Sequence, residues 1–358
     1  MKETFLLVDG NSLMHRAFHA LPLMDADGVY TNAVYGFFSM LLKVIREEKV
    51  QYLAVCFDEH APTFRHTVYS EYKAGRSATP PELRQQFDTI RTLLDDLGIR
   101  RFSLQGWEAD DLLGTLSLRG AEAGASPLLL TGDRDALQLV GSGTELMFTR
   151  KGISETIRFD ASKVYEEYGF TPQQVTDWKG LAGDSSDNIP GVPGVGDKTA
   201  VKLLQEYGTL EEVLANAGNV KGKLGEKLAA YADQARFSKE LATIRRDAPV
   251  DFSLGACVLP DLKNGIPALQ KLKLFSLVKR INTEEGVADA RETDRPDGET
   301  AITFEKFDFG PSKALDTPEE IQAWINEHAD GSCPICLWAD ETAVSLAVQT
   351  GKSTGSEP

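Results

Sequence analysis

Three continuous apolar segments, each closed by an aspartate, constrain the fold of this 358-residue chain more than any other feature. In chain order they are residues 4–8 with Asp9, residues 52–57 with Asp58, and residues 128–130 with Asp133 shortly after. Uninterrupted apolar runs of this kind are typical of strands that are buried on both faces. Amphipathic helical patterns separate them, the longest over residues 31–48. The sequence therefore predicts an α/β fold with a mostly parallel sheet.

The three aspartates are expected to lie together, because ligands bind at the edge formed by the carboxyl ends of parallel strands. Further carboxylates follow at the start of an apolar helical pattern and after the third strand, namely Glu108, Asp110, Asp111 and Asp135. A single aspartate at a strand end is usually a turn residue or a helix cap. So many packed carboxylates, however, could stay ionised only with cations between them. The joint pattern predicts a divalent-metal site.

A second cluster lies in residues 183–200. Asp184 and Asp187 precede a glycine-rich turn at 191–198, which leads into a helix that begins near Lys198. Glycines beside a helix start leave backbone N–H groups free to approach a phosphate, as in helix-hairpin-helix motifs that hold DNA without reading its bases. Next to two aspartates suited to a metal, this turn indicates a site for the DNA backbone.

Aromatic and basic side chains alternate in residues 65–76, where the basic ones are Arg65, Lys73 and Arg76. Such a pattern suits stacking on bases and binding of phosphates. A solvated basic loop explains the same pattern equally well when this segment is taken alone.

The net charge of −16 does not exclude a nucleic-acid partner, because the acidic residues are unevenly distributed. Residues 281–358 hold 17 of the 54 Asp and Glu residues and only 5 of the 38 Lys and Arg residues. The rest of the chain is therefore near neutrality, and positive once the carboxylates suited to metal are set aside. Residues 281–300 are acidic and poor in large apolar groups, which predicts a linker.

Localisation follows from what the sequence lacks. It has no apolar run of membrane length and no signal peptide, and its four cysteines are scattered, which predicts a cytoplasmic protein with no membrane partner. Cys333 and Cys336 form one CxxC pair, and without a second pair chance spacing is favoured over zinc binding.

Seven segments, taken in order, carry a resemblance to a known family: residues 6–12, 16–21, 31–37, 72–76, 108–111, 131–135 and 183–192. Over residues 4–280 the chain resembles the 5′-nuclease domain of bacterial DNA polymerase I and is similar to the wider flap-endonuclease group. The resemblance implies a PIN-like α/β domain at 1–170 with a helical arch at about 60–95. It also implies a helix-three-turn-helix DNA-binding subdomain at 171–280.

Site residues are carried over by the same resemblance. The implied metal ligands are Asp9, Asp58, Glu108, Asp110, Asp111, Asp133, Asp135, Asp184 and Asp187, and all are acidic in this chain. Lys73, Arg76 and Arg16 are implied to act on the scissile phosphate. The implied DNA contacts are Arg65, a stacking Tyr72, and Gly191, Val192, Gly194, Val195, Gly196 and Lys198 of the glycine-rich turn, where K⁺ would assist. Two Mg²⁺ ions, or Mn²⁺ in their place, suit this all-oxygen ligand set.

The implied function is a structure-specific 5′–3′ exonuclease and flap endonuclease that acts on 5′ flaps and on nicked or branched duplex DNA. The chain would be a monomer near the bacterial nucleoid and the N-terminal part of a DNA polymerase I, serving Okazaki-fragment processing and excision repair. Residues 301–358 resemble a truncated 3′–5′ exonuclease-like segment, which is predicted to be inactive because its first strand lacks an Asp-x-Glu pair.

Three other functions fit part of the pattern. A haloacid-dehalogenase phosphatase needs a second aspartate at position 11, which is Asn11. A PIN-type RNA endonuclease shares the acids but does not need the cluster at 183–198. A non-catalytic DNA-junction binder would have lost several carboxylates, and none is lost here.

Overall fold

The computed structural model describes residues 2–283 and two strands, β9 (Ile335–Ala339) and β10 (Val344–Val348), which pair antiparallel. The chain divides into two compact units, Met1–Asp297 and Gly298–Pro358. Nearly all of the predicted linker, and most of the segment interpreted as 3′–5′ exonuclease-like, lie outside the described residues. No helix among the described residues is long and apolar enough to cross a membrane.

A six-stranded sheet forms the centre of the first unit, in the order β5-β4-β1-β6-β7-β8. Its strands are β1 (Thr4–Asp9), β4 (Val50–Cys56), β5 (Arg100–Phe102), β6 (Ser126–Thr131), β7 (Glu145–Lys151) and β8 (Glu155–Phe159). Every neighbouring pair is parallel except β7 and β8. The predicted α/β class and mostly parallel sheet are therefore confirmed, and β1 lies between the other two strands that end in an aspartate.

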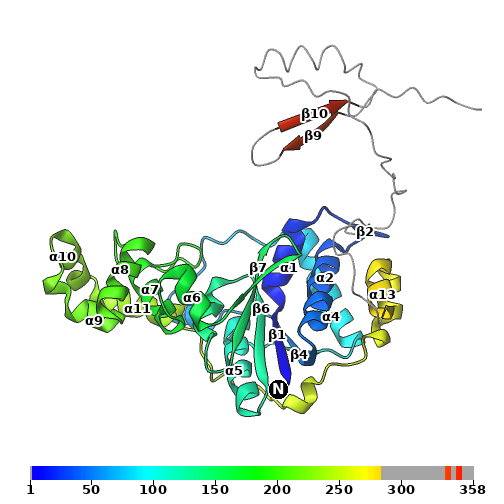
Figure 1. Cartoon of the computed structure of the whole chain (residues 1–358), viewed down its shortest axis with the longest axis horizontal. Coiled ribbons are helices and arrows are strands. Elements are labelled where there is room, and N and C mark those ends of the chain that lie inside the picture. Colours follow the sequence, from blue (N-terminus) through cyan, green and yellow to red (C-terminus); the bar gives the residue numbers. More distant parts are fainter. Residues whose placement is uncertain (1, 284–334, 340–343, 349–358) are drawn as a thin grey trace, which may run out of the picture. The chain divides into compact units, whose positions relative to one another are not determined.

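Helices cover both faces of this sheet, as Figure 1 shows. Leu6 and Val8 of β1 face a core shared with α1 (Gly10–Ala20), α2 (Asn32–Glu47) and α4 (Pro81–Asp96), while Phe5 and Leu7 face the core of α5 (Ala109–Glu122). This alternation follows from the two-residue period of a strand. On the first face, α12 (Ile266–Lys271) and α13 (Phe275–Asn282) add the buried side chains of Leu269 and Leu277.

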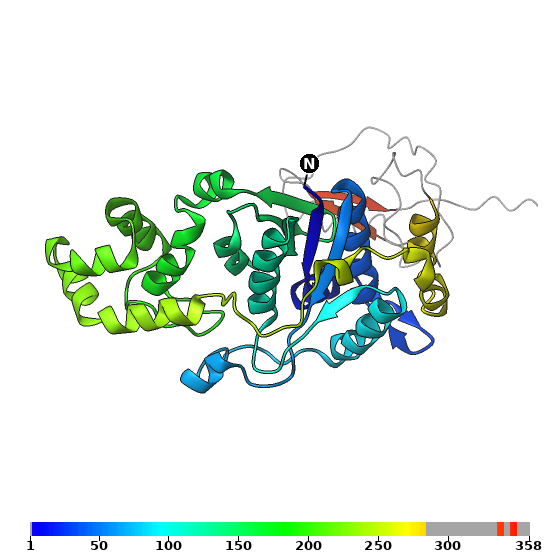
Figure 2. The same ribbon diagram turned by 90° about the horizontal axis from the view of Figure 1, so that it is seen from below.

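A small helical subdomain follows α6 (Ala161–Tyr168) and has a hydrophobic core of its own, which includes Leu181, Ala200, Leu203 and Leu228. Its helices are α7 (Val175–Ala182), α8 (Asp197–Tyr207), α9 (Leu210–Ala215), α10 (Lys223–Ala230) and α11 (Ala232–Ala242). After α11 the chain returns along the sheet domain to α12, as the yellow segment of Figure 2 shows. Shorter elements are β2 (Asp25–Ala26), β3 (Val29–Tyr30), α3 (Phe64–Val68) and the 3-10 turns Arg134–Leu139, Pro172–Gln174, Ala217–Asn219, Leu254–Cys257 and Leu262–Gly265.

The segment predicted to be a helical arch is helical only in part. Between α3 and α4, residues 69–80 form turns and extended chain that lie against the loop at 184–190. Lys73 N donates to Asp187 O at 3.0 Å, and Asn188 Nδ2 donates to Glu71 O at 2.8 Å. Lys73 has a left-handed backbone (φ 58°), and Pro80 and Pro81 follow, so a continuous helix is disfavoured here.

Candidate active site

The three strand-end aspartates lie at one edge of the sheet, and each is fixed by local donors. Asp9 caps α1 by accepting from Ser12 N at 2.9 Å, and it also accepts from Thr131 Oγ1 at 2.7 Å. Asp58 accepts from Asn11 Nδ2 at 2.9 Å and from Ala109 N at 2.7 Å. Asp133 accepts from Asp135 N at 2.9 Å. The capping role and a role at a metal site are therefore compatible, because each carboxylate keeps a second oxygen or lone pair.

Asp110 lies at the centre of this acidic edge. Burial, followed by the charges of Asp133, Asp9 and Asp135, raises the pKa of Asp110 well above its usual range. Its Oδ1 atom is buried and has no hydrogen-bond partner. Burial and neighbouring carboxylates likewise raise the pKa of Asp9 to about 7, and burial raises the pKa of Asp58. A buried oxygen without a donor, among carboxylates that repel one another, is the environment that a divalent cation satisfies, so these residues fit Mg²⁺.

The other carboxylates of the set carry basic partners. Lys73 Nζ donates to Glu108 Oε1 at 2.9 Å and lies 3.8 Å from Asp187 Oδ2, and Arg76 also pairs with Asp187. Within the described part of the chain, no three His, Cys, Asp or Glu side chains are arranged so that they could hold a metal ion as they stand. The basic side chains thus balance part of the negative charge in this arrangement, and a metal ion would compete with them for the same oxygens.

Lys179 is a site residue that the sequence analysis missed. Its side chain is buried, and its ammonium pairs with Asp135 and with Asp184, the latter at 2.5 Å. Burial lowers the pKa of Lys179, but the two carboxylates outweigh burial and raise it above its usual value. Burial raises the pKa of Asp184, but Lys179 outweighs this effect and brings it to about 2. No spacing rule connects Lys179 to Asp135, since the helix α7 brings them together from distant parts of the chain.

Asp111, predicted to be a metal ligand, is enclosed by hydrogen-bond donors of the protein. Its side chain is 0% exposed and accepts from Arg65 Nη1 and Nη2, both at 2.8 Å. It also accepts from Arg245 N at 2.8 Å and from Glu108 N at 3.2 Å. Four donors use the lone pairs of the carboxylate, so none is left for a metal ion.

Arg65 and Tyr72, predicted to be DNA contacts, are buried in this structure and bind protein groups. Besides Asp111, Arg65 donates to Leu241 O at 2.9 Å and Thr243 O at 2.7 Å. The Tyr72 hydroxyl lies 3.2 Å from Glu108 Oε2 and 3.0 Å from Asp187 Oδ2, and the ring is 4% exposed. Both side chains are therefore part of the buried structure that holds the site.

Arg16, predicted to act on the scissile phosphate, lies beside Gly132, which precedes Asp133. Its Nη1 atom donates to Arg150 O at 3.1 Å, whereas its Nε atom is buried without a partner. A methyl group on Gly132, just after β6, would lie 3.0 Å from that Nε. A cationic donor left free beside the carboxylates is suited to a phosphate oxygen.

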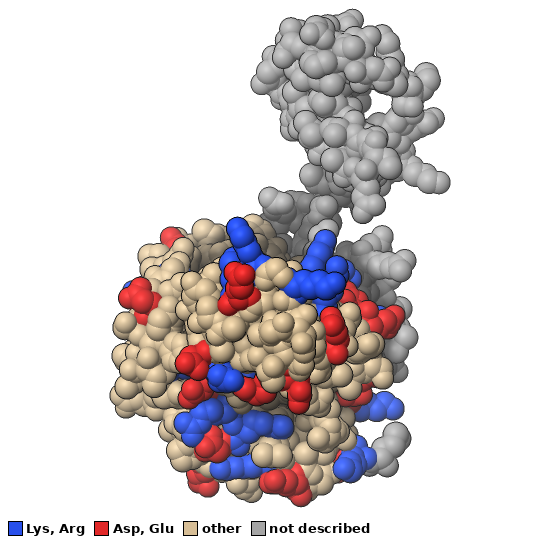
Figure 3. Space-filling model, turned by 90° about the vertical axis from the view of Figure 1, so that its left-hand side faces the viewer, with Lys and Arg blue, Asp and Glu red and all other residues tan. Residues whose placement is uncertain are grey.

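The glycine-rich turn at 191–198 connects α7 to α8 in the helical subdomain, whose outer end Figure 3 faces. Val192 and Val195 are buried in its core, so they anchor the turn rather than touch a ligand. Gly191 has φ 58°, and a methyl group there would lie 2.3 Å from Gly183 N, so only glycine fits. Gly194, Gly196 and Lys198 are exposed and remain available for a phosphate.

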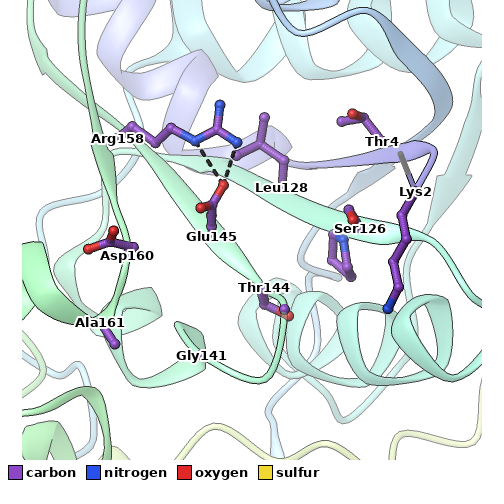
Figure 4. A pocket seen from close by; sticks show the side chains of 12 residues that line it. Lys2, Thr4, Ser126, Leu128, Gly141, Thr144, Glu145, Arg158, Asp160 and Ala161 are labelled. Atoms are coloured by element: carbon purple, nitrogen blue, oxygen red, sulfur yellow. Dashed lines mark hydrogen bonds and ion pairs between the residues drawn. The ribbon is translucent and has the colours of Figure 1, made fainter.

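A cavity of about 520 Å³ lies elsewhere, at the amino ends of β1 and β6. Figure 4 shows Arg158 and Glu145 among its lining residues. Arg158 Nε donates to Glu145 Oε2 at 2.8 Å, and Arg158 Nη1 donates to Glu48 Oε2 at 2.6 Å, so the cation is already paired. The cavity is remote from the carboxylates at the opposite ends of these strands.

Two family profiles match the chain. The profile described as 5′-3′ exonuclease, N-terminal resolvase-like domain, matches residues 4–169, and that described as 5′-3′ exonuclease, C-terminal SAM fold, matches residues 170–264. DNA polymerase I of Bacillus subtilis is 50% identical over 292 residues, which are 80% of this chain and 33% of the relative. DNA polymerase I of Bacillus caldotenax is 49% identical over 256 residues, or 71% and 29%. The chain thus spans about a third of the length of the curated relatives it matches.

Solved structures agree on the fold. A T5 5′-exonuclease with bound divalent metal ions (zinc) has a TM-score of 0.57 at 19% identity, covering 78% of this chain and 97% of its own. Human GEN1 in complex with Holliday junction DNA has a TM-score of 0.52 at 15% identity, covering 79% and 75%. Together with the profiles, these likenesses confirm the PIN-like α/β fold.

Proposed function

Because the chain belongs to the 5′–3′ exonuclease family, we propose that its acidic edge hydrolyses phosphodiester bonds in DNA near 5′ ends and flaps. The observation that carries this proposal is the buried Asp110 Oδ1, which has no donor and lies among carboxylates whose pKa values are raised. Such a group is unfavourable in the fold by itself and becomes favourable when a divalent cation binds. The bound metal ions of the T5 5′-exonuclease support this assignment.

Mg²⁺ is the proposed metal, with two ions in the site and Mn²⁺ as a substitute. Asp9, Asp58, Asp110 and Asp133 would hold one part of the metal site. Glu108, Asp135, Asp184 and Asp187 would hold the other part in exchange for their basic partners. Such ions lower the pKa of a bound water and neutralise charge on the attacking and leaving oxygens. Asp111 is left out of the ligand set because Arg65 and two backbone N–H groups already satisfy it.

The basic side chains would then bind the substrate. When Lys73 and Arg76 release Glu108 and Asp187, their charges lie beside the same site and can bind the scissile phosphate. Arg16 takes part in no ion pair among the described residues, and its guanidinium group would bind a phosphate oxygen without first breaking one. The exposed Gly194, Gly196 and Lys198 would hold the backbone of the downstream duplex, with K⁺ at the turn.

The domain division that we propose is a nuclease domain at 1–170, a DNA-binding subdomain at 171–280, a linker at 281–300 and a separate segment from 301. The chain would act as a monomer in the bacterial cytoplasm, near the nucleoid, as the N-terminal part of a DNA polymerase I in Okazaki-fragment processing and excision repair. The similarity to DNA polymerase I of Bacillus subtilis supports this placement. For the segment at 301–358 we keep the 3′–5′ exonuclease-like interpretation only as a proposal, since neither family profile reaches it.

A cleavage assay tests the proposal. A 5′-labelled flap duplex and the matching single strand are incubated with Mg²⁺ or with EDTA, and we expect Mg²⁺-dependent cutting near the flap junction with little on the single strand. The Asp133→Asn variant should lose this activity, while Asp88→Asn, at an exposed position of α4, should keep it. Binding of the flap without cutting in Mg²⁺ and Mn²⁺ would refute the nuclease and favour the non-catalytic junction binder.

A further inference from the structure

We propose that a second hairpin, residues 217–228, binds the phosphate backbone of the same DNA duplex as the first hairpin, residues 192–203. The first hairpin contains the glycine-rich turn already assigned to DNA, whereas none of the assigned site residues lies in the second. The inference therefore rests on the proposed function and adds a binding surface to it.

The two hairpins repeat one pattern at a spacing of 25 residues. Val192, Val195, Ala200 and Leu203 of the first correspond to Ala217, Val220, Gly225 and Leu228 of the second. These positions are apolar or glycine in both hairpins, and all of them are buried except the half-buried Val220. The same spacing places Lys223 at the position of Lys198, and Lys227 at that of Lys202.

Backbone geometry repeats together with the sequence. Val195 N donates to Val192 O at 3.0 Å in the first turn, and Val220 N donates to Ala217 O at 3.2 Å in the second. Each turn then leads into a helix, α8 or α10. At the start of α10 the chain packs so closely that a methyl group on Gly225 would lie 2.2 Å from Val220 O. The second hairpin therefore repeats the backbone structure of the first as well as its sequence pattern.

Lys227 joins the two hairpins in space. A methyl group placed on Gly194, in the first turn, would lie 2.6 Å from Lys227 Nζ. The ammonium of the second hairpin thus lies beside Gly194 of the first, one of the exposed residues proposed to hold the DNA backbone. One stretch of DNA backbone can therefore reach both.

Charge is what makes this surface specific for a polyanion. In the described part of the chain, no carboxylate lies within 4.0 Å of the amines of Lys198, Lys202, Lys221, Lys223 and Lys227, since none of them takes part in an ion pair. By contrast, Lys179 and Lys239 of the same subdomain are both paired. Figure 3 faces this end of the molecule, where groups of Lys and Arg side chains lie between Asp and Glu side chains.

The chemistry of these side chains selects phosphate rather than bases. Lysine is a compact, strongly hydrated charge on a flexible stem, which suits a phosphate oxygen, and the turn that presents it offers backbone N–H groups at the start of a helix. Backbone binding by lysine is independent of sequence and depends on salt, because each contact releases a counterion. We therefore expect the second hairpin to contribute affinity for duplex DNA without sequence preference.

The test measures binding of the full chain to a flap duplex in EDTA, which prevents cleavage, over a range of NaCl concentrations. The variant Lys221→Ala/Lys223→Ala should weaken binding roughly tenfold at moderate salt and lower the slope of log Kd against log salt by about 2. Lys227→Met keeps the alkyl stem and should lower the slope by about 1. The control Lys271→Ala/Lys279→Ala removes two exposed lysines of α12 and α13 and should leave both quantities unchanged.

Each outcome bears on one proposal. If the two second-hairpin variants bind like the control while the wild-type chain cleaves the flap in Mg²⁺, the second hairpin is refuted and the proposed function stands. An equal loss of affinity for duplex and for single-stranded DNA would refute the claim that both hairpins hold one duplex. If the wild-type chain neither binds nor cleaves the flap, the proposed function fails, and this inference with it.

Discussion

Two adjacent aspartates at the start of α5 are expected to respond in opposite ways to the same substitution. Asp110→Asn and Asp111→Asn both replace a carboxylate by an amide of equal size, and both residues lie in the first turn of the helix. The helix dipole therefore favours each carboxylate by a similar amount, about 0.3–1 kcal/mol. Any larger difference between the two variants must come from their surroundings.

Those surroundings predict the sign and the size of the change in the free energy of unfolding for each variant. Asp111 is fully buried against Arg65, and breaking a buried ion pair from one side costs about 3–5 kcal/mol, because the guanidinium stays buried without its partner. Asp110 has an oxygen without a donor and a pKa raised by burial and by other carboxylates, so neutralising it removes an unfavourable charge. At pH 8 in EDTA, Asp110→Asn should raise the free energy of unfolding by roughly 1–3 kcal/mol, the range that a buried acceptor without a donor costs.

Urea unfolding followed by tryptophan fluorescence measures both values, first in EDTA and then in Mg²⁺. Added Mg²⁺ should stabilise the wild-type chain and Asp111→Asn, but should stabilise Asp110→Asn much less. Equal destabilisation of the two variants in EDTA would refute the division between a structural and a metal-binding carboxylate. If only Asp111→Asn lost the stabilisation by Mg²⁺, Asp111 would be the metal-binding carboxylate and Asp110 the structural one.

Three further predictions follow from the same contacts. In EDTA the free energy of unfolding, measured by urea titration, should fall by a few kcal/mol from pH 5 to pH 8. The reason is that Asp9 and Asp135 have a pKa raised to about 7 in the fold, so in this range they bind protons that the unfolded chain has already released. Mg²⁺ should make this fall with pH smaller. Lys179→Met leaves two carboxylates without their counter-charge, so it should lower stability by about 3 kcal/mol in EDTA and by less in Mg²⁺, as thermal unfolding would show. Gly191→Ala, which forces a methyl group onto the backbone of Gly183 at φ 58°, should cost about 1–3 kcal/mol and weaken flap binding. Gly255→Ala, where the added methyl would lie 3.8 Å from Ser253 Oγ and outside both hairpins, should do neither.

The positions of the strand-end acids could be predicted because they depend on local pattern alone. An apolar strand that ends in an aspartate places that residue at the edge of a parallel sheet, and Asp9, Asp58 and Asp133 lie there. The orientation of Asp111 could not be predicted in this way. It is decided by Arg65 and by the backbone at Arg245, which the fold brings together from widely separated positions in the chain.

The same reason explains the other differences. Tyr72 and Arg65 have the residue types of a DNA-binding surface, but contacts with Glu108, Leu241 and Thr243 turn them inward. Residue type and spacing give the chemistry that a segment can offer. Only the tertiary contacts decide whether that chemistry faces the ligand or the interior.

The packing of α12 and α13 sets a lower limit on the length of an independently folding nuclease fragment. The match to the second family profile ends at residue 264, before either helix begins. Yet Leu269, Leu274 and Leu277 are almost completely buried in the core shared with α2 and α4. A fragment cut at 264 would expose these core contacts to water, at a cost of about 1.5–3 kcal/mol for each large apolar side chain that loses its cover. An independently folding nuclease fragment therefore includes α12 and α13, and a shorter one would expose an apolar face of the sheet domain and aggregate through it.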